Sequence, residues 1–175
     1  MTEKQRQSEQ LKRDLMSDDL ATVVSALKKC RESGDVSAVP VLIGLYATTQ
    51  VPMIRKETGE MLGSLKVTGS EQAFMAALKM PGYANIRQDL VSFMWNSGVQ
   101  PNGYLSELVE LALHGSFGEA LECLTLIEGM DGPFAEEQVL ESLTAVKKYL
   151  GTAVSDEKSA LFRDLLVMLE AAAAE

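Results

Sequence analysis

The chain has 175 residues, of which 46% are hydrophobic, and it carries 16 Lys plus Arg against 25 Asp plus Glu. This length suits one compact domain, and the hydrophobic share excludes wholesale disorder because it provides enough apolar surface to form a core. The net charge of −9 disfavours nucleic acid and anionic membranes as partners, since both attract clustered cations. We therefore expect a single domain over residues 1–175 with no nucleic-acid or membrane partner.

Residue types that build catalytic, cofactor and metal sites are sparse. The one histidine, His114, excludes sites that need two imidazoles, and its place before Gly115 favours a helix-capping role over catalysis. Cys30 and Cys123 lack metal-ligand spacing, which favours two reduced, partly buried thiols over a disulfide. We predict no catalytic residue, no cofactor and no metal. The polar N-terminus and the lack of an apolar run of about 20 residues predict a cytoplasmic protein.

Helix-forming residues dominate the composition, with 24 Leu and 18 Ala against 4 Ile, and they predict an all-α fold. In chain order, apolar steps of three and four residues predict two helices before Gly34-Asp35, with Ser17 as the N-cap between them. A short helix entered through Pro40 follows and ends at Thr48-Thr49-Gln50. The next helix begins near Pro52.

The apolar pattern then recurs along the sequence: Leu45 matches Leu78 at a step of 33, and Ile54-Arg55 matches Ile86-Arg87 at a step of 32. Two helices per repeat at this period predict an α-solenoid, with residues 1–34 as an N-terminal helical cap and residues 35–175 as helix-pair repeats. The pairs are predicted at 36–65, 70–97, 103–129 and 134–173, and the turns at Pro81-Gly82, Gly98 to Gly103 and Gly129 to Pro133.

Three segments, 34–42, 51–55 and 61–65, resemble a HEAT repeat: Pro40 lies early in the first helix, Arg55 near the start of the second, and Leu62-Gly63-Ser64-Leu65 closes the unit. The resemblance implies a short right-handed α-solenoid of about four HEAT-like pairs, as in small bacterial proteins of this family. The family commonly has an aspartate in the turn within each pair, where this chain has Thr48-Thr49-Gln50. Whether Arg55 and Arg87 form the family's inter-repeat ladder therefore stays open.

Charge is unevenly distributed along the chain. From Gln88 to Val146 the sequence contains no Lys or Arg but has ten carboxylates, whereas the rest of the chain sums to +1. A one-signed surface steers a basic partner toward it, and the alternative is a solvated face that keeps the protein soluble. Within this segment we take Glu119 and Glu122 as candidate contacts for a partner.

Arg87 and Trp95 are the other two candidate partner-binding residues. With Val91 they form a stripe along one helix, separate from its predicted core side. Tryptophan is a frequent anchor of protein interfaces. Even so, burial between repeats is the favoured interpretation for Trp95, and a bond to a neighbouring backbone carbonyl is favoured for Arg55 and Arg87.

These features predict a non-enzymatic interaction or scaffold module that binds a protein or peptide, basic in character, through a solenoid surface. Two alternatives stay open: an enzyme similar to the HEAT-like tetrapyrrole lyases, and an export or assembly chaperone. The oligomeric state is open between monomer and homodimer. The apolar face of the tail from Leu165 onward must be covered either by the preceding helices or by a second chain.

Overall fold

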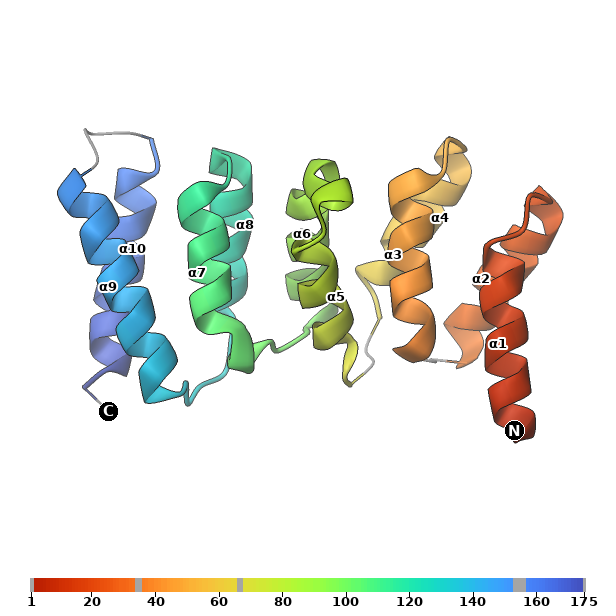
Figure 1. The fold of residues 1–175 in the computed structure, drawn as a ribbon, viewed down its shortest axis with the longest axis horizontal. Helices are drawn as coiled ribbons and strands as arrows, with labels where there is room; N and C mark the ends of the chain where they lie inside the picture. The colour runs from red at the N-terminus through yellow and green to blue at the C-terminus, as the bar shows by residue number, and fades with distance from the viewer. Residues whose placement is uncertain (1, 34–35, 66–67, 153–156, 175) are drawn as a thin grey trace. The chain divides into compact units, whose positions relative to one another are not determined.

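The computed structural model describes residues 2–33, 36–65, 68–152 and 157–174. These residues form ten α-helices and three short 3₁₀ helices and contain no strand, which confirms the all-α prediction (Figure 1). The α-helices are α1 Glu3–Leu15, α2 Leu20–Ser33, α3 Val39–Thr48, α4 Pro52–Leu62, α5 Ser70–Leu78, α6 Arg87–Ser97, α7 Leu105–His114, α8 Phe117–Glu128, α9 Glu136–Thr152 and α10 Ser159–Ala172.

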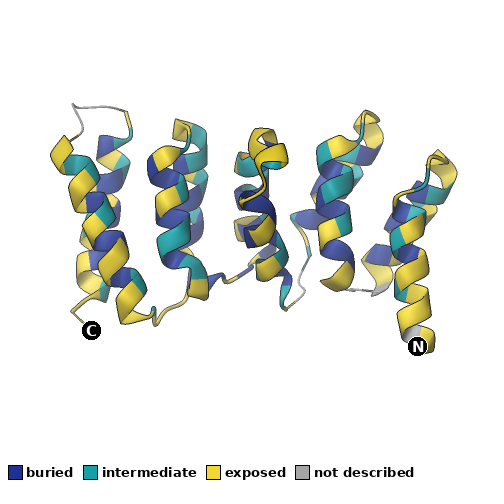
Figure 2. Ribbon diagram, in the orientation of Figure 1, coloured by how far each residue is buried: buried dark blue, intermediate teal, exposed yellow. Residues whose placement is uncertain are grey.

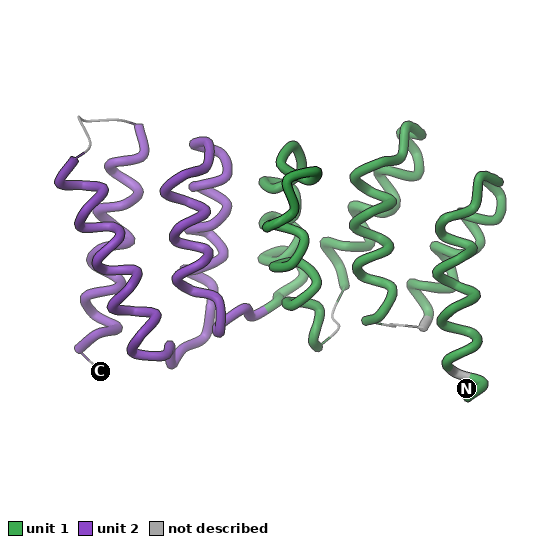
Figure 3. The backbone as a smooth tube through the Cα atoms, in the orientation of Figure 1, with its two compact units in different colours: residues 1–99 green, residues 100–175 purple. Residues whose placement is uncertain are grey.

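The chain divides into two compact units, residues 1–99 and 100–175 (Figure 3). The division falls inside the turn predicted from Gly98 to Gly103, and a single domain over the whole chain stays a prediction. Gly98 ends α6 with a φ of +73°, a left-handed conformation that glycine adopts without steric cost. We call the two parts the N-terminal unit and the C-terminal unit.

The N-terminal unit consists of three pairs of contacting helices, α1 with α2, α3 with α4, and α5 with α6. Helices α1, α3 and α5 contact in succession, and so do α2, α4 and α6, which gives two layers within this unit. Each helix buries one side and exposes the other, because apolar residues recur at helical spacing (Figure 2). Large side chains that are fully buried include Leu42, Ile54, Leu62, Phe74 and Met94.

The C-terminal unit contains two pairs, α7 with α8 and α9 with α10, and α7 also contacts α9 while α8 contacts α10. On α10, Phe162, Leu165 and Leu169 are buried, whereas Val167 is 68% exposed. The contacts of α10 with α8 and α9 cover these three buried side chains within the chain.

Helix boundaries follow the predicted signals closely, with two differences. Helix α3 ends at Thr48 and α4 begins at Pro52, as expected. The cap before α2 is Asp19 and not Ser17, because the Asp19 carboxylate accepts the backbone N–H of Thr22 at 2.9 Å. The turn predicted at Pro81-Gly82 is the start of a 3₁₀ helix, Pro81–Ile86. The end of the first two helices, predicted at Gly34-Asp35, lies outside the described residues.

An arginine closes the end of the first helix in two pairs of the N-terminal unit. Arg55 Nη1 donates to the Tyr46 carbonyl at 3.0 Å, and Arg87 Nε donates to the Leu78 carbonyl at 3.1 Å. Donor and acceptor are nine residues apart in both cases, and the two bonds are offset by the predicted repeat step. Since the last carbonyls of a helix lack intrahelical partners, these bonds satisfy groups that folding leaves open.

Arg55 also reaches the following pair. Its Nη2 lies 3.7 Å from Asp89 Oδ2, and its guanidinium stacks 4.3 Å from the centre of the Tyr46 ring. The Tyr46 hydroxyl donates to the same Asp89 oxygen at 2.8 Å. One arginine therefore links α3, α4 and α6 within the N-terminal unit.

In the C-terminal unit a lysine takes over this role. Lys158, next to the start of α10, donates from Nζ to the carbonyls of Leu113 at 2.8 Å, Gly115 at 2.9 Å and Ala112 at 3.3 Å. The same ammonium lies 5.7 Å from the centre of the Tyr149 ring, within cation–π range. The end of α7 is thus closed from the following helix pair.

Candidate functional site

Arg87 has a defined structural contact. It is the first residue of α6, and its guanidinium is half-buried against the end of α5, where it donates to the Leu78 carbonyl. This is the backbone-carbonyl contact that the sequence analysis favoured. A contact between Arg87 and a partner stays a prediction.

Trp95 is 40% exposed, so the favoured interpretation of burial between repeats is wrong. Helix α6 buries Leu90, Val91, Met94 and Ser97. These positions span about a third of the helix circumference, and Trp95 lies about 40° beyond Val91, past the edge of the buried arc. Its indole therefore belongs to the exposed surface of the N-terminal unit, and its contact with a partner stays a prediction.

Glu119 stabilises the start of α8. Its carboxylate accepts the backbone N–H of Ser116 at 2.7 Å, while the Ser116 hydroxyl accepts the backbone N–H of Glu119 at 3.2 Å. This capping box satisfies two of the N–H groups that a helix start leaves without partners. Glu119 therefore has a folding role, and its spacing of three residues from Ser116 is the sequence signature of that role.

Glu119 and Glu122 also act on Cys123, which is fully buried in α8. Burial raises the pKa of the Cys123 thiol to about 12, and the negative charges of Glu119 and Glu122 act in the same direction. The thiol is therefore protonated and unreactive near neutral pH.

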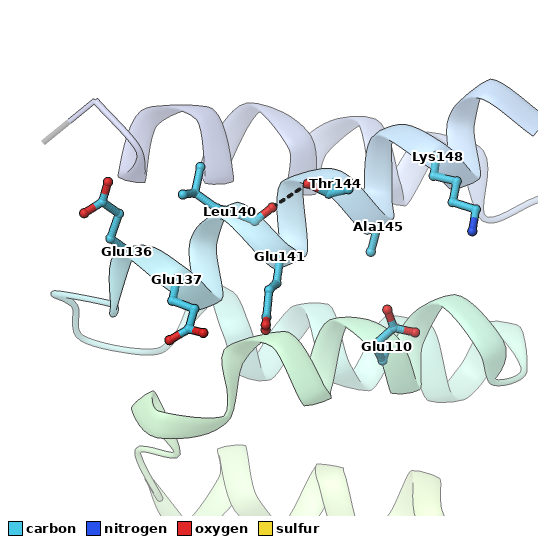
Figure 4. A pocket seen from close by; sticks show the side chains of 8 residues that line it. All are labelled: Glu110, Glu136, Glu137, Leu140, Glu141, Thr144, Ala145 and Lys148. Atoms are coloured by element: carbon cyan, nitrogen blue, oxygen red, sulfur yellow. Dashed lines mark hydrogen bonds between the residues drawn. The ribbon is translucent and has the colours of Figure 1, made fainter.

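The exposed carboxylates of the C-terminal unit meet in a different place. A groove of about 720 Å³ lies between α7 and α9 (Figure 4), and we call it the acidic groove. Half of its lining residues are glutamates. They line it together with one lysine and three less polar side chains: Glu110, Glu136, Glu137, Leu140, Glu141, Thr144, Ala145 and Lys148.

The geometry of the acidic groove follows from helix periodicity. Glu137, Glu141 and Lys148 are four and seven residues apart, so they project from one face of α9. Figure 4 shows Glu137 and Glu141 pointing from α9 toward α7, where Glu110 stands on the opposite wall. Carboxylates from two helices therefore face a common space, which suits the binding of lysine or arginine side chains.

The charged side chains at the ends of the acidic groove have different surroundings. Glu136 and Glu137 lie in the first turn of α9, where the positive end of the helix dipole stabilises carboxylates. Glu110 Oε2 lies 3.1 Å from Nε2 of His114, the last residue of α7. Lys148 lines the other end of the groove, so the three glutamates of α9 concentrate negative charge toward the start of that helix.

A second groove adjoins the first, between the segment before α9 and the end of α10. It has a volume of about 620 Å³, and we call it the apolar groove. Its walls are mainly apolar and include Pro133, Phe134, Val139, Met168 and the alanines 171–173. Leu140 and Glu136 line both grooves, and Leu140 is 52% exposed.

Sequence reasoning counted the groove glutamates in the acidic segment but selected Glu119 and Glu122, which lie on α8 and do not line the groove. Glu110 joins the site only because α7 packs against α9, a contact that no local pattern reveals. The signal that was present is the pair Glu137 and Glu141 at a spacing of four, flanking Leu140.

Within the described residues, no group of three or more His, Cys, Asp or Glu side chains is arranged to hold a metal ion. None of the helices in the described part of the chain combines the length and apolar composition needed to cross a membrane. No known protein family, curated protein or solved structure matches the chain. The resemblance to HEAT repeats therefore stays a prediction.

Proposed function

We propose that the protein is a non-enzymatic interaction module whose C-terminal unit binds a basic segment of a protein partner. The observation that carries this proposal is the acidic groove, where glutamates of α7 and α9 line one space. Long-range attraction to such a surface raises the rate of encounter with a cationic partner and disfavours anionic ones.

The sequence distribution of charge supports the same proposal. Residues 100–175 contain 14 carboxylates and 4 cations, so the C-terminal unit carries a net charge of −10. Three of the four cations have defined places: Lys158 bonds the end of α7, Lys147 Nζ lies 2.9 Å from a Glu170 carboxylate oxygen, and Lys148 lines one end of the groove. Little positive charge is left to offset the groove.

The proposed scaffold is a short right-handed α-solenoid of about four HEAT-like helix pairs behind an N-terminal cap, in a cytoplasmic protein. Two features support the repeat part of this proposal. The arginine bonds of Arg55 and Arg87 are equivalent at the repeat step, and the helix pairs of the N-terminal unit are layered in succession. Repeats of this kind present surface to partners along their helices.

An affinity capture tests the function. The full chain is immobilised as wild type, as the groove variant Glu137→Gln with Glu141→Gln, and as a control, Glu128→Gln with Asp164→Asn, which neutralises two exposed carboxylates outside the groove. We expect wild type and control to retain the same basic proteins at low salt and to release them at high salt, and the groove variant to retain much less. Equal retention by all three chains contradicts the proposal.

A further inference from the structure

The two grooves of the C-terminal unit form one continuous docking surface. Leu140 and Glu136 line both, so the apolar groove and the acidic groove meet along α9. A leucine that is 52% exposed between Phe134 and Met168 on one side and carboxylates on the other loses contact with water only when something covers it. Burial of that apolar area is favourable, at about 25 cal/mol per Å².

The charged residues that line the grooves determine which kind of partner can bind there. Glu136, Glu137 and Glu141 border Leu140, and Glu110 lies across the groove on α7, opposite Ala145 in Figure 4. A second copy related by a two-fold axis would place four glutamates and one lysine from each chain in one interface, and this excess of negative charge is unfavourable. A partner with lysines or arginines beside an apolar stripe matches both the walls and the rim.

The helices around the grooves also determine which secondary structure the partner segment adopts. The acidic groove is walled by side chains of α7 and α9, and the apolar groove by side chains of α9 and α10 together with the segment 132–134. The interior backbone groups of these helices are already bonded within the helices. An extended peptide would find few backbone partners there, whereas a helix satisfies its own backbone and presents one apolar face. The distance along α9 from Glu136 to Lys148 is about 18 Å, which matches a helix of about twelve residues.

We infer that the joined grooves bind a cationic amphipathic helix of about twelve residues that belongs to a partner protein. Its apolar side chains cover Leu140 and enter the apolar groove beside Phe134 and Met168, and its lysines or arginines pair with Glu137, Glu141 and Glu110. An acidic residue near one end of that helix faces Lys148. This inference rests on the proposed function and adds the site, the form and the orientation of the partner.

Synthetic peptides provide the probe. One labelled peptide of leucine, alanine and lysine places its leucines at helical steps of three and four, and a second has the same composition with the leucines spread around the helix. Both peptides carry the same charge, so the difference between their affinities measures the contribution of the apolar stripe. Measured by fluorescence anisotropy at low salt, the ordered peptide is expected to bind at least about tenfold tighter.

Variants locate the site. Leu140→Ser is expected to weaken binding of the ordered peptide about fivefold and to leave the scrambled peptide unaffected, whereas Val167→Ser, on the exposed side of α10, changes neither. Neutralising Glu137 and Glu141 together is expected to weaken both peptides about fivefold, while the Glu128 and Asp164 control does not. All of these positions are exposed, and circular dichroism checks that each variant is folded.

The outcomes separate the two proposals. Equal binding of the two peptides, or no effect of Leu140→Ser, overturns the docking surface while leaving recruitment of basic segments in place. Failure of both lysine peptides to bind overturns both. Light scattering tests whether a second copy of the chain occupies this surface. A dimer that dissociates in Leu140→Ser would assign the surface to a second copy and overturn the inference.

Discussion

Both units consist of helix pairs, but the N-terminal unit is nearly balanced in charge whereas the C-terminal unit is strongly acidic. The N-terminal unit holds 12 cations and 11 carboxylates, and the C-terminal unit holds 4 cations and 14 carboxylates. At the next repeat step, the position of Arg55 and Arg87 is occupied by Glu119, which caps α8. An arginine closes the end of the first helix within a pair of the N-terminal unit, whereas Lys158 of the following pair closes the end of α7 in the C-terminal unit.

This difference explains how a helix pair can carry an excess of negative charge and still stay folded. Removing an arginine from the start of the second helix leaves the end of the first helix without a donor. A single lysine reaching back from the next pair satisfies three carbonyls there. The helix pair can then replace its own cation with a carboxylate, and its outer surface is left acidic.

The strongest test of the comparison is Lys158→Met, which keeps the aliphatic stem and removes the donor. Because charged hydrogen bonds to the carbonyls of Leu113, Gly115 and Ala112 are lost together, we expect the free energy of unfolding to fall by about 3 kcal/mol. Urea titration measures the loss, and amide hydrogen exchange should place it within residues 100–175. Lys148→Met, at an exposed site, is the control. Equal losses in the two variants contradict the closing role of Lys158.

Arg55→Met and Arg87→Met sharpen the comparison inside the N-terminal unit. Arg55 bonds the Tyr46 carbonyl, stacks on the Tyr46 ring and approaches Asp89, so its loss should lower stability by about 2 kcal/mol. Arg87→Met removes the bond to Leu78 and should cost about 1 kcal/mol. Thermal unfolding measures which of the two variants loses more stability. A larger loss for Arg87 would show that the link to Asp89 adds nothing.

Titration of Cys123 gives a pH signature of the C-terminal unit. Its native pKa of about 12 exceeds the ordinary value of 9.0, so between these values the thiolate forms in the unfolded chain but not in the folded one. Stability is therefore unaffected well below pH 9.0, and between pH 9.0 and the native pKa it falls by up to about 1.4 kcal/mol per pH unit.

Urea titrations on both sides of pH 9.0 check this slope, and Cys123→Ala should remove it. Tyr46, whose pKa is raised from 10.0 by burial and by its hydrogen bond to Asp89, contributes a later decline that persists in this variant. An unchanged slope in Cys123→Ala would assign the decline to other groups.

The smallest expected effect is that of Glu119→Ala, which removes the carboxylate half of the capping box. We expect a loss of about 0.5 kcal/mol near neutral pH, since one exposed hydrogen bond at a helix start is broken. The matched variant Glu122→Ala, one turn further along α8, leaves the box intact and should change stability less. Both variants also take a negative charge away from Cys123, which should lower the pKa of its thiol.

Much of the fold could be predicted because it depends on local patterns. The repeat step that aligned Arg55 with Arg87 reappears as two equivalent hydrogen bonds, and a proline and a glycine correctly predicted the start of α4 and the end of α6. The cap before α2 was misplaced because Ser17 and Asp19 are both good N-cap residues, and only the geometry chooses between them.

The candidate site could be predicted only in part, because its charges come from helices that are distant in sequence. A count along the chain found the acidic segment, but the choice of Glu137, Glu141 and Glu110 requires the contact between α7 and α9. Lys158 shows the same limit: 43 residues separate it from Gly115, and no local spacing signals the bond between them.

Trp95 gives the two-unit architecture a built-in optical reporter. It is the single tryptophan of the chain, it belongs to the N-terminal unit, and it is 40% exposed. Its emission will therefore shift to longer wavelength when residues 1–99 unfold, whereas helical circular dichroism follows both units. Melting curves from the two signals coincide if the units unfold together, and they differ if one unit unfolds first. The unlabelled protein therefore reports how strongly its units are coupled.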